Sequence, residues 1–189
     1  MIPNFIELHD DWDSAVPENG PILFVGTGIP EKGLGVALEA FSQWRKGDSR
    51  DLHVVGSIAN QEHKAGVNYR GFLTGNALWE AYRAASIVVV PSTWQEPCPT
   101  VALEAMAFGR PVIGSAVGGI KDIVVDRETG MLVPPNDVAA LVGAFNTLTA
   151  NRGMLSAMGR NGRKRVREFS VDQVVPRIEH LYASVQTSA

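Results

Sequence analysis

Short apolar runs that alternate with helical segments constrain the fold of this chain more than any other feature of its sequence. Four runs rich in β-branched residues occupy Ile22–Val25, Leu52–Val55, Ile87–Val90 and 111–113, and weaker ones lie at 67–69 and 131–133. Continuous runs of this kind are typical of strands covered on both faces. Helical patterns fill the intervals, at 33–45, 76–84, 100–108, 119–125, 137–149, 152–168 and 171–185. The sequence therefore predicts an α/β fold, a doubly wound (Rossmann-like) parallel sheet with a helical C-terminal tail.

Length and composition fit one domain behind a short linker. Residues 1–20 show no sustained period and are interpreted as a linker, and residues 21–189 as one domain. The net charge of -3 gives no electrostatic attraction to nucleic acid, so we expect no nucleic-acid partner. Cys98 is the one cysteine, which excludes an intrachain disulfide. No apolar run approaches the roughly 20 residues of a membrane span and the N-terminus lacks a signal-peptide pattern, so we expect a cytoplasmic location.

A glycine-rich loop follows the first predicted strand, at residues 26–33. Gly26 and Gly28 allow a tight turn and a close approach to a ligand, and the next helix offers free N–H groups to an anion. Glu31 stands where a dinucleotide fingerprint needs its third glycine, and Lys32 precedes Gly33 where a P-loop needs Ser or Thr. Two interpretations remain: a phosphate-binding loop in which Lys32 supplies a positive charge, or an ordinary turn with a surface lysine.

Two glutamates flank the start of the predicted helix at 100–108. Glu96 lies in the loop before this helix and Glu104 about one turn inside it, among apolar neighbours. A carboxylate in such surroundings is costly to bury unless it accepts hydrogen bonds, and sugar hydroxyls are suitable donors. The free N–H groups near Thr100 and Val101 favour phosphate. The alternative is that an internal partner satisfies Glu104 and that water solvates Glu96.

The spacing of Glu96 and Glu104, with seven residues between them, resembles the E-x7-E signature of retaining GT-B glycosyltransferases, and more specifically of the large family 4 group. Four further stretches match landmarks of that family in order and spacing: Pro30-Glu31-Lys32-Gly33, Gly109-Arg110-Pro111-Val112-Ile113, Gly118-Gly119-Ile120 and Thr129-Gly130-Met131-Leu132-Val133. The resemblance covers nearly everything from residue 21 onward. It implies the C-terminal, donor-binding half of a GT-B fold.

The resemblance implies roles for three charged residues of these motifs. Lys32 would contact the diphosphate of a nucleotide diphosphate sugar, and Glu104 would accept hydrogen bonds from the ribose hydroxyls. Glu96 would contact hydroxyls of the transferred sugar. Lys32 and Glu96 are therefore the candidate catalytic residues of a hexosyl-type transferase that retains the anomeric configuration.

The other donor-binding candidates lie on three loops: Gly26, Thr27 and Gly28 after the first strand, Thr100 and Val101 through their backbone, and Phe72 and Leu73 in the stretch 70–73 against the base. The donor would be of the UDP, GDP or ADP type. No metal and no cofactor are expected, because lysine, arginine and helix ends neutralise the charge. Thr27 departs from the family, which usually has an arginine there. A charge-assisted hydrogen bond contributes about 1.5–3 kcal/mol, so phosphate contact would be weaker.

The resemblance also implies a partner domain of similar size, N-terminal to this one, that binds the acceptor. Ile2-Pro3-Asn4 resembles the start of the interdomain linker, so we expect a donor half that is inactive without that domain. The alternative is a non-catalytic nucleotide or nucleotide-sugar binding module, with a sugar-nucleotide epimerase as a third option.

Three other features are open to two interpretations each. The predicted helix at 152–168 carries Arg160, either Arg163 or Lys164, and Arg167 on one face, which suits either water or a peripheral contact with the inner membrane face. Trp94 either packs on a sugar or base or covers the core. Cys98 lies near a helix start that would lower the pKa of its thiol, although no catalytic partner stands near it in the sequence.

Overall fold

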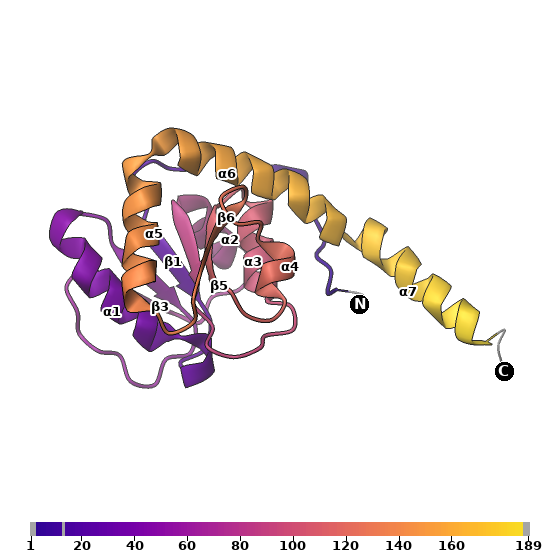
Figure 1. Ribbon diagram of the computed structural model, residues 1–189, viewed down its shortest axis with the longest axis horizontal. Coiled ribbons are helices and arrows are strands. Elements are labelled where there is room, and N and C mark those ends of the chain that lie inside the picture. Colours follow the sequence, from indigo (N-terminus) through magenta and orange to yellow (C-terminus); the bar gives the residue numbers. More distant parts are fainter. Residues whose placement is uncertain (1–2, 13, 187–189) are drawn as a thin grey trace.

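The computed structural model describes residues 3–12 and 14–186, and within them six strands form one parallel sheet (Figure 1). The strands are β1 (Ile22–Val25), β2 (Leu52–Val55), β3 (Val67–Gly71), β4 (Ile87–Val90), β5 (Val112–Ser115) and β6 (Gly130–Val133). Their order across the sheet is β3-β2-β1-β4-β5-β6, and every pairing is parallel. The predicted doubly wound fold is confirmed, including the two weak strands.

Helices cover both faces of the sheet and one crosses its end (Figure 1). They are α1 (Leu34–Trp44), α2 (Gly75–Ala84), α3 (Thr100–Ala107), α4 (Ile120–Ile123), α5 (Val138–Ala150), α6 (Arg152–Arg165) and α7 (Val171–Gln186). The helices α1 and α5 pack on one face, and α2, α3 and α4 on the other. The predicted helix at 152–168 ends at Arg165 and continues as a 3-10 turn (Val166–Phe169), from which α7 projects away from the domain.

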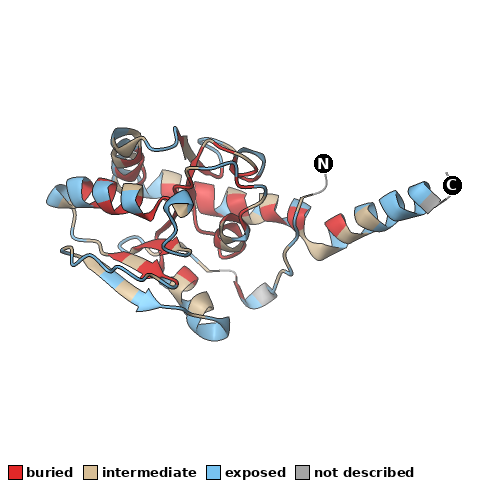
Figure 2. Ribbon diagram, turned by 90° about the horizontal axis from the view of Figure 1, so that it is seen from below, coloured by how far each residue is buried: buried red, intermediate tan, exposed pale blue. Residues whose placement is uncertain are grey.

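Alternating side chains of the strands build two hydrophobic cores, one on each face. Ile22 and Phe24 of β1 pack with α1 and α5, whereas Leu23 packs with α2, α3 and α4. All four residues of β4 are buried, since this central strand is covered on both sides. Figure 2 shows buried residues gathered inside the domain, whereas exposed residues dominate the helix that leads to the C-terminus. The continuous apolar runs in the sequence follow from this double burial.

The strand order reverses direction between β1 and β4. Connections from β1 lead outward to β2 and β3, and those from β4 lead outward to β5 and β6. A crevice opens at such a switch point, beyond the carboxyl ends of the strands, and ligands of open α/β sheets bind there. The loops 26–33 and 91–99 leave the two central strands at this point.

The described part of the segment before residue 21, which we predict to be a linker, has little regular structure but is packed against the domain. It contains one 3-10 turn (Asp10–Trp12). Trp12 is 4% exposed, and its ring stacks on that of Phe108 with centroids 4.7 Å apart. Ile6 forms a parallel bridge with Ser170, just before α7. Packing against α3 and the start of α7 therefore fixes a segment whose own sequence shows no period.

Candidate functional site

Lys32 and Glu96 meet at the switch point as an ion pair. The ammonium of Lys32 donates to Oε1 of Glu96, and the hydroxyl of Ser92 donates to Oε2 at 2.6 Å. The side chain of Glu96 is 9% exposed and that of Lys32 is 29% exposed. The carboxylate is thus held by a cation on one oxygen and a buried hydroxyl on the other, as a nearly buried charge requires.

Backbone contacts bring the two central loops together. The N–H of Thr93 donates to the carbonyl oxygen of Glu31 at 2.8 Å. Gly33 has a φ of 71°, and a Cβ at this position would overlap the carbonyl oxygen of Pro91. Only glycine accepts both the left-handed conformation and this approach. Lys32 thus supplies a charge, and Gly33 lets the loop 26–33 come close to the loop 91–99.

The glycine pair at 118–119 supports the Glu96 loop from its other side. The N–H of Gly119 donates to the carbonyl oxygen of Glu96 at 2.7 Å, and that of Gly118 to Oε1 of Gln95 at 2.8 Å. A Cβ on Gly118 would overlap the backbone of Glu96. The landmark at Gly118-Gly119 in the sequence thus positions the first glutamate of the pair.

Glu104 lies on α3 with its carboxylate half-buried and paired to a phenol. The hydroxyl of Tyr82, on α2, donates to Oε2 of Glu104 at 2.6 Å. Burial raises the pKa of Glu104, and the hydrogen bond from Tyr82 opposes that shift in part. The alternative interpretation holds in part: Tyr82 is an internal partner for one oxygen of Glu104, whereas Glu96 is bound by Lys32 and Ser92 and is not solvated by water.

The first turn of α3 faces the same crevice as the ion pair. Val101 lines a small cavity of about 20 Å³ together with Lys32 and Glu96. The backbone N–H groups of Thr100 and Val101 make no hydrogen bond with any part of the chain that is described. Glu104 lies one turn along the same side of α3 as Thr100 and Val101. The helix α3 therefore presents two free amides and, one turn later on the same side, a carboxylate.

The glycine loop after β1 is open to solvent at its tip. Gly56, with a φ of 139°, lies close to Gly26, and a Cβ added at position 56 would overlap the carbonyl oxygen of Gly26. Thr27 and Gly28 are exposed and line a groove of about 390 Å³ with residues of the loop after β2. The groove lies beside the loop, with Ile58 on its opposite wall. The position of Thr27 is therefore accessible to a ligand.

Three apolar candidates differ in burial. Phe72, just after β3, is 73% exposed, while Leu73 is half-buried against the core. Trp94 is 45% exposed, so covering the core is not its main role. These residues lie on loops that leave the carboxyl ends of β3 and β4, where a base or sugar could be stacked.

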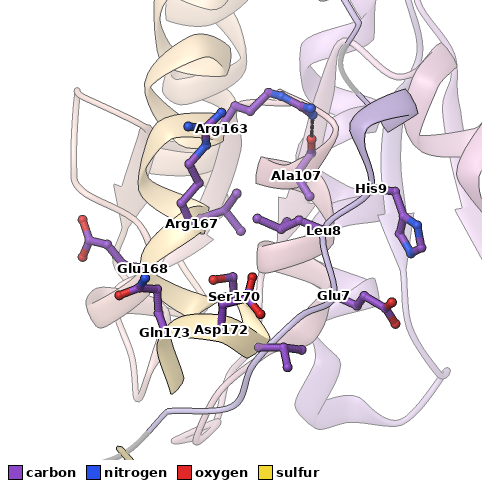
Figure 3. Close-up of a pocket in the computed structure, with 12 residues that line it drawn as sticks. Glu7, Leu8, His9, Ala107, Arg163, Arg167, Glu168, Ser170, Asp172 and Gln173 are labelled. Atoms are coloured by element: carbon purple, nitrogen blue, oxygen red, sulfur yellow. Dashed lines mark hydrogen bonds between the residues drawn. The ribbon is translucent and has the colours of Figure 1, made fainter. Parts of the chain in front are cut away.

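A large cavity lies away from the crevice, between the N-terminal segment and the α6–α7 corner (Figure 3). Its volume is about 820 Å³. Arg163 donates across it to the carbonyl oxygen of Ala107, at the far end of α3 from the crevice. None of the predicted site residues lines it. The sequence motifs and this cavity therefore point to different regions.

Cys98 differs from its sequence-based expectation. Burial raises the pKa of its thiol, a hydrogen bond with the backbone of Asn4 opposes this, and Asp122 and Glu96 raise it further. The prediction of a lowered pKa is wrong, because nearby carboxylates and burial outweigh the helix start. Within residues 3–12 and 14–186, no group of three or more His, Cys, Asp or Glu side chains could hold a metal ion.

Ser92 and Tyr82 are site residues that sequence reasoning missed. Ser92 stands in the motif stretch beside Pro91, so its spacing to Glu96 was a usable signal. Tyr82 comes from a different helix, 22 residues before Glu104, and no spacing rule links the two.

Comparisons with known proteins agree with this architecture. The profile of the family described as glycosyl transferases group 1 matches residues 10–165. An uncharacterized glycosyltransferase of Methanocaldococcus jannaschii is 30% identical over 85% of this chain and 44% of its own length. A D-inositol 3-phosphate glycosyltransferase of Salinispora arenicola is 30% identical over 88% of this chain and 42% of its own.

Solved structures show the same fold. Sucrose-phosphate synthase from Thermosynechococcus elongatus superposes with a TM-score of 0.84 at 30% identity, over 100% of this chain and 53% of that one. HepE of Anabaena, solved in complex with UDP, superposes with a TM-score of 0.84 at 19% identity, over 97% and 57%. The chain spans about half the length of the relatives that it matches. On the match over residues 10–165, it belongs to the glycosyl transferases group 1 family.

Proposed function

We propose that this chain is the donor-binding half of a retaining glycosyltransferase, which moves a sugar from a nucleotide diphosphate sugar to a hydroxyl acceptor. One observation carries the proposal: the switch point of the sheet gathers Lys32, Glu96 and the free amides of α3, with Glu104 one turn along. HepE, of the same fold, has been solved with UDP and with UDP-glucose. Family membership and this geometry together support a donor of the UDP, GDP or ADP type.

Each part of the donor has a suitable partner in the crevice. The Lys32 ammonium and the amides of Thr100 and Val101 suit a diphosphate, because a helix start favours negative charge. Glu104 suits the ribose hydroxyls, since Oε1 has no hydrogen-bond partner in the described chain. Glu96 suits the transferred sugar. Gly26, Thr27 and Gly28 would let the backbone approach the donor, and Phe72 and Leu73 would lie against the base.

The proposed chemistry needs charge stabilisation more than a base from this domain. The bond from the anomeric carbon to the diphosphate oxygen breaks, and its electron pair goes to the diphosphate. The acceptor hydroxyl forms its bond to that carbon on the same face, and its proton goes to the departing diphosphate. Lys32 and the α3 amides would stabilise the charge that develops on the leaving group, which lowers the barrier. We propose that no metal takes part.

The acceptor site would come from a further domain. The chain spans only about half the length of its relatives. Its N-terminal segment forms a bridge from Ile6 to Ser170, just before α7, and α7 projects from there away from the domain (Figure 1). On the outer half of α7, Leu181, Tyr182 and Val185 are exposed apolar residues. We propose that a partner domain covers this helix and closes over the crevice. Without it, the chain would bind donor but transfer no sugar.

A peripheral contact with an acidic membrane surface is a further part of the proposal. Arg160 and Lys164 on α6, and Arg167 in the 3-10 turn that follows it, are exposed at the end of the sheet away from the crevice. Each cation near such a surface contributes about 1 kcal/mol. None of the described helices is long and apolar enough to cross a membrane. Cosedimentation with phosphatidylglycerol vesicles, but not phosphatidylcholine vesicles, would support a cytoplasmic protein at the inner membrane face; equal sedimentation would remove this part.

The test of the proposed function is calorimetric titration of the chain with UDP, GDP and ADP. At least one should bind, and Glu104→Ala should weaken it about tenfold or more, because a hydrogen bond to a charged group contributes about 1.5–3 kcal/mol. The control is Glu179→Ala, an exposed glutamate of α7. Absence of binding by all three nucleotides would overturn the proposed function.

A further inference from the structure

The Tyr82 side chain is fully buried and far in sequence from the motifs of the site. Its exposed fraction is 0%, and its ring stacks on that of Phe108 at 5.4 Å with the planes 8° apart. Phe108 also stacks on Trp12, with the ring centroids 4.7 Å apart. Buried aromatic pairs of this geometry hold each ring in place. The tyrosine hydroxyl is therefore fixed at one point beside α3.

That hydroxyl contacts one oxygen of Glu104 and leaves the other available. The Tyr82 hydroxyl donates to Oε2 of Glu104 at 2.6 Å, whereas no donor in the described chain reaches Oε1. Oε1 is not among the buried side-chain atoms that lack a partner, so it is accessible from outside the core. Burial first, and then the Glu104 carboxylate, raise the pKa of Tyr82 well above its usual range, so the phenol stays protonated and can only donate to the carboxylate.

We propose that Tyr82 is the positioning residue of the ribose site: its hydroxyl holds one oxygen of Glu104 so that the other accepts hydrogen bonds from the ribose of the donor. This inference rests on the proposed function. A carboxylate fixed by one short hydrogen bond has less rotational freedom to lose when it binds a pair of hydroxyls, and such preorganisation increases affinity. Tyr82 itself touches no ligand in this account and acts only through Glu104.

The test compares a nucleoside diphosphate with its counterpart that lacks the ribose hydroxyls. The probe is the tightest binder among UDP, GDP and ADP, together with its 2′,3′-dideoxy form, titrated into the 189-residue chain. The chain should prefer the hydroxylated form. Tyr82→Phe keeps the ring and its stacking, and should reduce that preference about five- to tenfold, as expected for the loss of one hydrogen bond. Affinity for the dideoxy form should stay unchanged.

Two controls separate positioning from a general effect on structure. Tyr182→Phe changes an exposed tyrosine on α7 and should leave the preference intact. In a Glu104→Gln background, adding Tyr82→Phe should change the preference no further, since Tyr82 acts through the carboxylate. If circular dichroism shows Tyr82→Phe alone to be poorly folded, the comparison of Glu104→Gln with the double variant Glu104→Gln/Tyr82→Phe decides. Equal preference in these two proteins supports positioning, and a further loss in the double variant overturns it.

The outcomes also separate this inference from the function beneath it. A wild-type chain that binds no nucleotide overturns the proposed function and the inference with it. A chain that binds nucleotide but shows no preference for the hydroxylated form removes the ribose role of Glu104. A preference that persists in folded Tyr82→Phe overturns the positioning role alone and leaves donor binding standing.

Discussion

The ion pair between Lys32 and Glu96 predicts opposite effects of its two partners on nucleotide affinity. In the ligand-free chain, Glu96 occupies one of the three N–H groups of the Lys32 ammonium and places a negative charge beside the proposed diphosphate site. Glu96→Gln removes that charge but keeps an oxygen that can accept from Ser92. Lys32→Met removes the cation and keeps a side chain of similar length.

The burial of the pair sets the expected magnitudes. The two side chains are 29% and 9% exposed, so the pair is better shielded from water than a surface ion pair, which contributes about 0–1 kcal/mol. UDP has to compete with this pair for the ammonium in wild type, and Glu96→Gln removes that cost of about 1 kcal/mol. UDP affinity should therefore rise about fivefold in Glu96→Gln. Lys32→Met removes a contact with the diphosphate of about 1.5–3 kcal/mol, but it also removes the ion pair with Glu96 that has to rearrange when UDP binds to wild type. UDP affinity should therefore fall about tenfold.

Calorimetry with UDP measures both effects, with Lys46→Met as the control on an exposed lysine at the other end of α1. The expectation for Glu96→Gln is the opposite when the ligand carries the sugar. Because Glu96 is proposed to contact the transferred sugar, this variant should lose affinity for the nucleotide sugar relative to UDP. If Glu96→Gln instead weakened UDP binding as much as Lys32→Met does, the carboxylate would be part of the diphosphate site and the reasoning would be refuted.

Three other changes test the structure around the site. Gly33→Ala forces a side chain into a φ of 71° and against Pro91, so urea denaturation should show a loss of at least about 1–3 kcal/mol in the free energy of unfolding; an unchanged midpoint would contradict this contact. Burial raises the pKa of Glu104, so the folded chain favours the protonated acid and loses stability as the pH rises through that pKa. The stability of Glu104→Gln relative to wild type should therefore increase as the pH rises above about 4.3, the ordinary pKa of a glutamate, and a constant difference in urea midpoint would argue against the shift. Asp137→Ala removes the acceptor for the N–H of Ala140 at the start of α5 and should cost about 1 kcal/mol of unfolding free energy without changing UDP affinity; an altered affinity would link α5 to the site.

Sequence patterns predicted the fold because local composition and tertiary burial agree in this chain. The central strand β4 reads as four consecutive apolar residues since both of its faces are covered. Lys32, Glu96 and Glu104 could be placed because each lies at a strand exit or a helix start, and parallel strands bring such points to one edge.

The remaining features depend on contacts that no local pattern encodes. Tyr82 reaches Glu104 only because α2 and α3 pack side by side on one face of the sheet. Trp12 belongs to the core although its segment shows no period, because its ring completes the stack on Phe108. Cys98 has a raised rather than a lowered pKa, since the side chains that surround it are set by the fold.

A crystal structure of the chain with the tightest-binding of UDP, GDP and ADP tests the central claim most directly. The account predicts the nucleotide beyond β1 and β4, with its diphosphate against Lys32 and the amides of Thr100 and Val101, and its ribose hydroxyls on Oε1 of Glu104. A nucleotide seated instead in the 820 Å³ cavity beside α6 and α7, with Glu104 untouched, would contradict it.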